Sequence, residues 1–417
     1  MLNLLQKGQK ILLVEPPFYR FFDYERWHYP ITLDLIATYL DEMGFNVMVY
    51  DADKPSPNCS SLNRTQVREK YPLYKEALNN ENHPIWAEVQ NTIEKYAPDV
   101  VGLTSITAKI DATDKIAKMV KQLYGNKVTT ILGGSHVQGM LASYPGYRFI
   151  SQYDHLVIQI PNLVDRTPNK NLIMNVNEYS AKNLSTIMTS SGCPNSCTFC
   201  CHSYDKKIIY RNIDSIREEL TQIRESYGAS WEVYVVDDCL LSNNKHFRSV
   251  CSIMSDLDLK FSAGSRIMAL SPDKITEFIN SGGVRLLVGV ESGSQQILDK
   301  VKKKLKIEEI KRRTKWLNDA GIPWSAFFVV GFPFETLDDL KITRDLIDEI
   351  QPSFVSLNRF TPYPGTEIFN EYYADKGLKF KDLFQLNPLS GGERSSEIEE
   401  YINQLFKFVD EYNLRKQ

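Results

Sequence analysis

Three cysteines in one short segment carry the most specific chemical signal in this chain. Cys193, Cys197 and Cys200 are spaced by four and three residues and follow an apolar run that predicts a strand. Thiolates are soft ligands that favour iron–sulfur clusters or zinc. Three of them on one loop could hold three irons of a cubane cluster and leave one iron without protein sulfur. Gly192 and Pro194 beside the first cysteine are typical of a loop that wraps closely around a bound group.

Two other interpretations of these thiols are open. A structural zinc site could add His202 to the three cysteines, although such sites usually take ligand pairs from separated segments. A disulfide needs an oxidising compartment, whereas seven cysteines, an odd number, and residues 1–10 without a signal-peptide pattern favour the reducing cytoplasm. The other cysteines are expected to be buried packing residues: Cys59, Cys201, Cys239 and Cys251.

The cysteine loop follows the first of about six strand-plus-helix units. Because apolar strand-like runs alternate with helical patterns, this part of the chain predicts an α/β fold with parallel strands. Six units make an incomplete, (β/α)6 TIM-type barrel, with its chemistry at the carboxyl ends of the strands. The strands are expected to begin near Ser185, Glu232, Leu259, Arg285, Ser325 and Phe354.

The first third of the chain predicts a second α/β domain. Strand-like runs at 11–14, 46–50, 100–103 and 128–132 alternate with helical patterns, as in a Rossmann-like parallel sheet that binds ligands at the carboxyl ends of its strands. The pattern is lost between His155 and Lys182. We therefore expect four parts: a Rossmann-like domain at 1–154, a linker at 155–184, the partial barrel at 185–368, and a short helical extension at 369–417 that covers the open side of the barrel.

The composition excludes several functional classes. The 417 residues suit two or three domains, each with its own core. Forty-nine Lys and Arg against 52 Asp and Glu give a net charge of −3, too balanced for binding nucleic acid through bulk positive charge. No apolar run approaches the roughly 18 residues of a membrane span. We expect a soluble, cytoplasmic protein with neither nucleic-acid nor membrane partners.

The segment CPNSCTFC resembles the CxxxCxxC loop of the radical S-adenosylmethionine (SAM) superfamily, including an aromatic residue, Phe199, before the last cysteine. The resemblance implies a [4Fe-4S] cluster held by Cys193, Cys197 and Cys200, with SAM chelating the open iron. It also implies an external one-electron reductant, such as flavodoxin or ferredoxin, and a small-molecule substrate. The deoxyadenosyl radical from reductive SAM cleavage abstracts hydrogen from an unactivated carbon, chemistry that belongs to the cofactor.

Further motifs at predicted strand ends extend this resemblance over about residues 185–367. The motifs are VVDD, the turn GVESG, the turn GFPFET and TPYPGTEI. Asp237, Asp238 and Glu291 could alternatively be solvated loop charges or helix caps, and the lysine run 300–304 predicts a solvated helix flank. The resemblance implies that these residues contact SAM: Phe199, Asp238, Arg266, Glu291, Ser292, Gly331 and Pro333.

The amino-terminal domain resembles the cobalamin-binding domain that precedes the barrel in one large radical SAM subgroup. The family's DxHxxG motif is absent after Val14 and its Gly-Glu-Gly-Glu turn is absent near 154–161, so any bound cobalamin should lack a histidine ligand from the first loop. His136 is expected only to line a loop. The resemblance implies that these residues contact cobalamin: Glu15, Pro16, Ser105, Thr107, Gly133, Gly134 and His136.

Three functional hypotheses follow. The first is a cobalamin-dependent radical SAM methyltransferase that acts on an unactivated carbon of a metabolite or natural product. The second is a radical SAM enzyme that uses the same cluster without cobalamin for a rearrangement, cyclisation or oxidation. The third, from another class, is an iron–sulfur sensor or electron carrier. Arg266, Glu291 and the GFPFET turn argue against the third, because an electron carrier needs no nucleoside pocket.

Overall fold

The computed structural model describes residues 5–26, 28–56, 59, 62, 64–158, 160, 163, 165–201, 207–384 and 394–416. The chain forms two compact units. The first unit comprises Met1–Leu62, Gln66–Leu184 and Tyr363–Phe384, and the second comprises Asn63–Thr65, Ser185–Pro362 and Gln385–Gln417. No helix of the described residues is long and apolar enough to cross a membrane.

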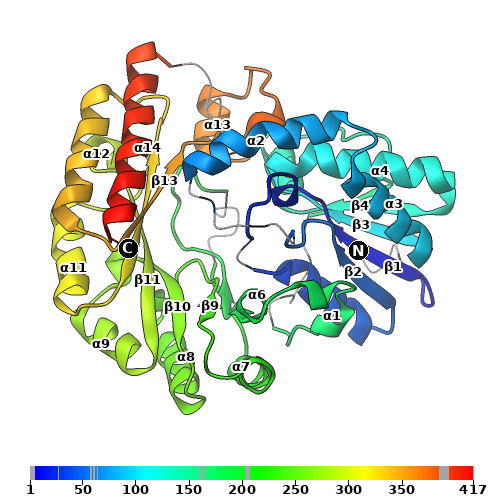
Figure 1. The fold of residues 1–417 in the computed structure, drawn as a ribbon, viewed down its shortest axis with the longest axis horizontal. Coiled ribbons are helices and arrows are strands. Elements are labelled where there is room, and N and C mark those ends of the chain that lie inside the picture. The colour runs from blue at the N-terminus through cyan, green and yellow to red at the C-terminus, as the bar shows by residue number, and fades with distance from the viewer. Residues whose placement is uncertain are drawn as a thin grey trace. The chain divides into compact units, whose positions relative to one another are not determined.

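The first unit is built on a five-stranded sheet of order β2-β1-β3-β4-β5, with every pair parallel. The strand order reverses between β1 and β3, the place where sheets of this kind bind ligands at their carboxyl ends. Helices α1 and α4 pack against the sheet (Figure 1). The strands are β1 (Lys10–Glu15), β2 (Asn46–Asp51), β3 (Val100–Thr104), β4 (Thr129–Gly133) and β5 (His155–Val157). The helices are α1 (Ile31–Glu42), α2 (Arg64–Asn79), α3 (Pro84–Tyr96), α4 (Ile110–Tyr124), α5 (Ser135–Ser143) and α6 (Ala181–Leu184).

The second unit contains a six-stranded parallel sheet of order β6-β9-β10-β11-β12-β13, in which sequential strands are neighbours. The predicted strand starts lie within two residues of the observed ones, and the predicted α/β fold class is confirmed. The strands are β6 (Thr186–Ile187), β9 (Val233–Val235), β10 (Phe261–Arg266), β11 (Gly283–Glu291), β12 (Trp324–Val330) and β13 (Phe354–Arg359). The helices are α7 (Ile213–Tyr227), α8 (Asn244–Asp256), α9 (Pro272–Asn280), α10 (Gln295–Lys300), α11 (Ile307–Asp319), α12 (Leu337–Ile350) and α14 (Ser396–Lys416).

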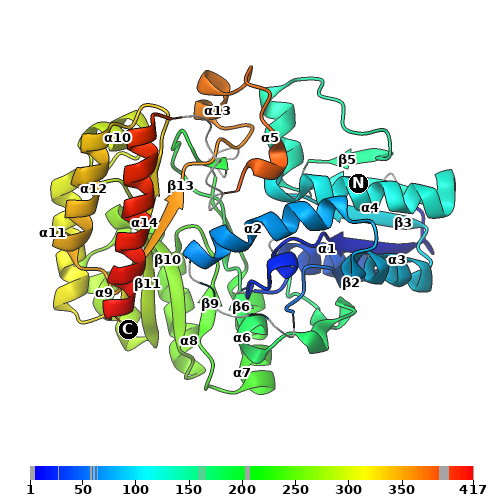
Figure 2. The same ribbon diagram turned by 45° about the horizontal axis from the view of Figure 1, so that its top comes forward.

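The last helix, α14, packs on the edge strand β13 and beside α12 in both views (Figures 1 and 2). Its Asn413 side chain accepts a hydrogen bond from the Val355 amide at 2.8 Å and donates one to the Val355 carbonyl at 2.9 Å. A side-chain amide thus replaces the missing neighbouring strand, which protects an edge that would otherwise leave backbone groups unpaired.

The observed units differ from the predicted domain limits in two segments. Residues 155–184 were expected to be a linker, but they contain β5, and the Met174 amide bonds to the Val49 carbonyl at the outer edge of β2. Tyr363–Phe384, with α13 (Glu367–Tyr372), belongs to the first unit. There Phe384 stacks on Tyr71 with ring centroids 5.2 Å apart. Long-range contacts of this kind leave no periodic pattern in the sequence.

Candidate active site

The carboxyl end of the barrel sheet holds a cavity of about 240 Å³. It brings together all three cysteines of the motif and four of the residues expected to contact SAM. The cavity is lined by Cys193, Cys197, Cys200, Phe199, Asp238, Arg266 and Glu291. Sequence reasoning did not select several further lining residues: Asn195, Tyr234, Gly264, Ser265, Leu287, Gly289, Lys303 and Phe327.

The cysteine loop is anchored by carboxylates at the end of β9. Asp237 accepts hydrogen bonds from the amide and hydroxyl of Thr189 at 2.6 and 2.5 Å and from the Ser190 hydroxyl at 2.6 Å. Asp238 accepts one from the Gly192 amide at 3.1 Å. Asp237 is buried, so it is not a solvated charge, and its hydrogen bonds go to Thr189 and Ser190 before the cysteine motif. Both aspartates tie the strand end to the residues that lead into the cysteine motif.

Gly192 is required at the entrance of the loop. Its φ is +101°, and an added Cβ would lie 2.2 Å from the carbonyl oxygen of Lys207. No side chain fits this position, because both the left-handed backbone and the contact exclude one. The interpretation of Gly192 as part of a tightly wrapped loop therefore has a steric cause in the neighbouring chain segment.

The thiols differ in their surroundings. A hydrogen bond with Cys239 lowers the pKa of Cys193 to about 6, and the same bond raises the pKa of Cys239. Cys239 and Cys251 are buried, as predicted, whereas Cys59 and Cys201 are only partly buried. Burial raises the pKa of Cys197, although the charge of Lys303 opposes this shift. All seven cysteines are free thiols in the structure.

Glu291 and Lys303 form an ion pair inside the cavity, with 2.6 Å between Oε1 and Nζ. The two side chains are only 10% and 13% exposed. Burial lowers the pKa of Lys303, but the charge of Glu291, the charge of Cys197 and the hydrogen bond to Glu291 together outweigh this effect, and the net shift is upward. The expectation that the lysine run 300–304 is a solvated flank is wrong for Lys303, because the chain after α10 turns this side chain inward.

The backbone at the end of β11 is adapted to this pair. The register shifts between Gly289 and Glu291, and Glu291 has a φ of +73°. An added Cβ on Gly289 would lie 2.5 Å from Oε1 of Glu291 and 3.1 Å from Nζ of Lys303. A bulge that re-aims a side chain beside a site is a recurrent device. Here it directs the carboxylate into the cavity, and Gly289 leaves room for it.

Three residues expected to contact SAM do not line the cavity. The Ser292 hydroxyl lies 3.2 Å from the Thr343 hydroxyl of α12 and is fully buried. At Gly331 the backbone amide donates to Glu335 and the carbonyl accepts from Arg394, so both groups already have partners within the protein. Pro333 lies in the same turn and is also absent from the lining. Thr343 and Arg394 are distant in sequence from the residues to which they bond, whereas Glu335 lies within the GFPFET turn itself.

The donor set of the cavity fits an iron–sulfur cluster. Three thiols face one space together with two cationic side chains, Arg266 and Lys303, and soft sulfur ligands suit iron. Among the residues that the structure describes, no three His, Cys, Asp or Glu side chains are grouped as ligands of a single metal ion. His202, the fourth ligand of the alternative zinc site, lies outside the described residues.

At the carboxyl edge of the first unit, four residues expected to contact cobalamin lie together. The His136 ring nitrogen Nδ1 is 3.2 Å from the Thr107 hydroxyl, and the His136 amide bonds to the Ser105 carbonyl at 3.1 Å. Gly134 has a φ of +101°, and an added Cβ would lie 2.4 Å from the Ser105 carbonyl oxygen. The glycine and the small hydroxyl residues thus let the ends of β3 and β4 approach closely.

His136 is 1% exposed, which differs from the expected loop-lining position. Its ring packs edge-on against Phe149 and Phe380, and burial lowers its pKa to about 4. The ring is therefore neutral and enclosed. No histidine–cobalt bond is therefore expected from this position, and Ser105 and Thr107, 1% and 6% exposed, are likewise covered by the protein.

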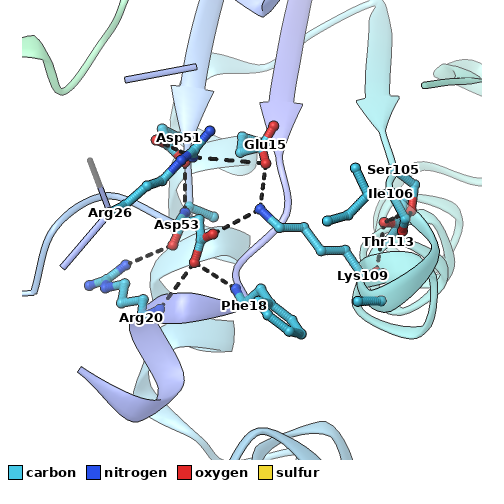
Figure 3. Close-up of polar contacts among 12 residues, drawn as sticks. Glu15, Phe18, Arg20, Arg26, Asp51, Asp53, Ser105, Ile106, Lys109 and Thr113 are labelled. Atoms are coloured by element: carbon cyan, nitrogen blue, oxygen red, sulfur yellow. Dashed lines mark hydrogen bonds and ion pairs between the residues drawn. The ribbon is translucent and has the colours of Figure 1, made fainter. Parts of the chain in front are cut away.

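The other predicted contact, Glu15, belongs to a network of buried charges at the ends of β1 and β2 (Figure 3). Lys109 bridges Glu15 at 2.5 Å and Asp53 at 2.8 Å, and Arg26 bridges Asp51 at 3.3 Å and Glu15 at 3.9 Å. Burial raises the pKa of Asp51 to about 6. The partners of Glu15 are thus supplied by the protein itself, and Pro16 beside it is buried.

The chain thus combines a partial barrel that holds a three-cysteine cavity with a second parallel sheet. Family models agree: residues 187–347 match the radical SAM superfamily, and residues 23–150 match the B12 binding domain. The second unit thus carries a radical SAM domain, and the first unit carries a B12-binding domain. The recognition from sequence and the prediction of an enzyme are confirmed, and the three predicted cofactors are confirmed at the level of these two domains.

Curated relatives include methyltransferases. The chain is 24% identical over 339 residues to an uncharacterized methyltransferase of Pyrococcus horikoshii, a match that covers 70% of this chain and 73% of that protein. It is 20% identical to the cytidylyl-2-hydroxyethylphosphonate methyltransferase of Streptomyces wedmorensis, over 88% of this chain and 82% of that protein.

Two solved structures share the fold. The radical SAM methyltransferase TsrM of Kitasatospora setae, with cobalamin and a [4Fe-4S] cluster bound, has a TM-score of 0.61 at 14% identity and covers 86% of this chain and 74% of its own. The cobalamin-dependent SAM radical enzyme OxsB, with aqua-cobalamin and SAM bound, has a TM-score of 0.57 at 15% identity. That match covers 97% of this chain and 61% of OxsB.

Proposed function

We propose that this chain is a cobalamin-dependent radical SAM methyltransferase that methylates an unactivated carbon of a small molecule. The observation that carries the proposal is that Cys193, Cys197 and Cys200 line the same cavity as Arg266 and the Glu291–Lys303 pair. Methyltransferases among the relatives and a B12-binding domain in the same chain support the choice of methyl transfer.

The residues of the cavity suit a ligand that carries an amino acid group. Glu291 presents a carboxylate and Lys303 an ammonium, both shielded from water. The amino and carboxylate groups of SAM have the complementary charges, so a bound methionine end extends this pair into an array of alternating charges. Charge-assisted hydrogen bonds of this kind are among the stronger polar contacts in proteins. Arg266 adds a second cation at the end of β10.

The cysteines would hold a [4Fe-4S] cluster, which supplies the electron for SAM cleavage when it is bound. The chain's own contribution is to place the donors, orient the ligand and limit the access of water. Cys197 is 8% exposed, and Phe199 and Phe327 contribute apolar walls to the cavity. An external one-electron donor, such as flavodoxin or ferredoxin, completes the proposed reaction.

The test is anaerobic reconstitution of the full chain with iron and sulfide. We expect about four irons per chain and, after reduction, release of 5′-deoxyadenosine from SAM. A single bound zinc ion with no SAM cleavage would contradict the radical SAM assignment. Cys200→Ala should abolish SAM cleavage, whereas Cys201→Ala, the matched control, removes a neighbouring thiol that does not line the cavity and should leave the cluster in place.

Cobalamin use is tested separately by titration of the isolated protein with hydroxocobalamin. We expect a change in the absorbance spectrum, co-elution of cobalamin with the protein, and formation of S-adenosylhomocysteine under reducing conditions. Deoxyadenosine formation without cobalamin binding would favour the second function, a cobalamin-independent rearrangement, cyclisation or oxidation. The burial of Ser105 and His136, 1% exposed each, is the observation that keeps this second function under test.

A further inference from the structure

The turn after β12, residues 331–335, is held by two side chains. One bonds to backbone amides of the turn, and the other bonds to a backbone carbonyl. The carboxylate of Glu335 accepts hydrogen bonds from the amides of Gly331 and Phe332, the second at 3.2 Å. Arg394 donates to the carbonyl of Gly331. Gly331 has a φ of +86°, and an added Cβ would lie 3.0 Å from the guanidinium carbon of Arg394. The guanidinium therefore packs directly on the glycine.

Arg394 is in turn fixed by the first turn of α14. Its guanidinium bonds to Glu399 at 3.0 Å, and Glu399 also accepts from Arg359 at 2.8 Å. Arg359 is the last residue of β13 and is 1% exposed. Asn403 accepts from the same arginine at 3.2 Å. The start of α14 thus ties together the carboxyl ends of β12 and β13.

The turn reaches the cysteine loop through two aromatic rings. Phe332, next to Gly331, is 1% exposed and packs edge-on against Phe199, with ring centroids 5.7 Å apart. Phe199 lies between Cys197 and Cys200 and lines the cavity. A shift of the Gly331 backbone therefore moves Phe332 and removes the support behind the cysteine loop.

We propose that Arg394, which lies in the carboxyl-terminal extension beyond the barrel strands, is a positioning residue for the SAM site. It holds Gly331 so that Phe332 supports Phe199 and the loop of the three cysteines. This inference rests on the proposed function, because it assumes that SAM occupies the cavity. The region that matches the radical SAM family, residues 187–347, does not include Arg394.

The first test measures SAM binding to the reconstituted full chain. We expect Arg394→Ala to raise the dissociation constant and the KM for SAM about tenfold, the effect of one hydrogen bond to a charged group, with kcat nearly unchanged. Arg394→Lys keeps a donor and a charge for Glu399 and should recover most of the affinity. An unchanged dissociation constant in Arg394→Ala overturns the proposal.

The second test needs no bound cofactor. Hydrogen exchange at the amides of Gly331 and Phe332 should be faster in Arg394→Ala than in the native chain, because the turn loses one of its two side-chain anchors. Unchanged exchange would show that Arg394 does not hold the turn at 331–335. If the native chain binds no SAM, the proposed function fails, whereas the exchange result still tests whether Arg394 holds this turn.

Asn413→Ala is the matched control. It removes two hydrogen bonds between α14 and Val355, the second residue of β13. Val355 lies near the start of the strand, whereas Gly331 follows the carboxyl end of β12. We expect a lower Tm and an unchanged affinity for SAM. If Asn413→Ala weakens SAM binding as much as Arg394→Ala, the effect reflects general docking of α14, and the positioning role of Arg394 is refuted.

Discussion

The carboxyl edges of the two parallel sheets use buried charge in different ways. In the first unit, Glu15, Asp51 and Asp53 are matched by Lys109 and Arg26 within the protein (Figure 3). In the second unit, the Glu291–Lys303 pair and Arg266 face a cavity. Burying a charge is costly unless it is paired and hydrogen-bonded. The first edge is thus satisfied within the protein, whereas the second places charged groups at the wall of a cavity.

The replacement of a cysteine of the motif should have the largest effect, because it removes the site of the second unit and leaves the charge network of the first unit in place. We expect Cys197→Ala to abolish cluster assembly and SAM cleavage, since the cluster would keep two of three protein ligands. Iron content and deoxyadenosine yield are the measurements. Cys251→Ala, a buried thiol of α8 outside the cavity, should retain both. Retained SAM cleavage in Cys197→Ala would contradict the ligand assignment.

The buried charge network of the first unit predicts a large effect on the free energy of unfolding. Asp53→Ala leaves Lys109 with one carboxylate and removes the acceptor for the Phe18 amide at 2.7 Å. Breaking a buried pair by removing one partner costs about 3–5 kcal/mol. The free energy of unfolding, measured in urea, should fall by that order.

The matched control for Asp53 is an exposed pair of the same unit. Lys54 lies 2.7 Å from Glu178, whose side chain is 42% exposed. Glu178→Gln should change the free energy of unfolding by less than about 1 kcal/mol. Equal effects of the two substitutions would show that the buried network contributes no more than a surface pair.

The Glu291–Lys303 pair, which lines the cavity of the second unit, predicts an effect on SAM binding. Lys303→Gln should weaken SAM binding by roughly 30-fold, which corresponds to about 2 kcal/mol for a hydrogen bond between charged groups. Equilibrium binding to the reconstituted protein measures this change, and Lys304→Gln, one residue further on and exposed, is the control. Unchanged affinity in Lys303→Gln would mean that the Glu291–Lys303 pair is only structural.

The smallest expected effect is on the pH dependence of the free energy of unfolding. It concerns buried carboxyl groups at the carboxyl edges of both sheets. Burial raises the pKa of Glu335 to about 8 from its ordinary 4.5, with Asp339 adding to the shift and Arg394 opposing it. In the first unit, Arg26 limits the pKa of Asp51 to about 6. A raised pKa means that the folded state keeps its proton longer than the unfolded chain. The stability that this raised pKa contributes is therefore fully present below the ordinary pKa of a glutamate. It is lost as the pH rises toward about 8, the pKa of Glu335 in the folded state.

Glu335→Gln should remove this part of the slope. The free energy of unfolding, measured between about pH 5 and pH 8, should fall less with rising pH in the variant than in the native chain. Glu400→Gln, at an exposed position of α14, should leave the slope as it is. An identical slope in native protein and Glu335→Gln would show that Glu335 ionises normally.

Local sequence patterns were sufficient for much of the fold and for the core of the site. The spacing of Cys193, Cys197 and Cys200 and the alternation of strands and helices are encoded within short windows, where periodicity and spacing are direct consequences of backbone geometry. The capping box of α12, Thr336 with Asp339, is a local feature of the same kind. Glu291 was selected because it ends an apolar strand, and it lies in the cavity.

Tertiary structure alone decided the features that depend on distant partners. Lys303 resembles its lysine neighbours in sequence, and only the turn after α10 brings it to Glu291. The backbone groups of Gly331 are taken by Glu335 and Arg394, the latter 63 residues away. Tyr363–Phe384 joins the first unit although it follows the barrel's last strand. Such contacts arise from packing between segments far apart in the chain, so no local spacing or periodicity records them.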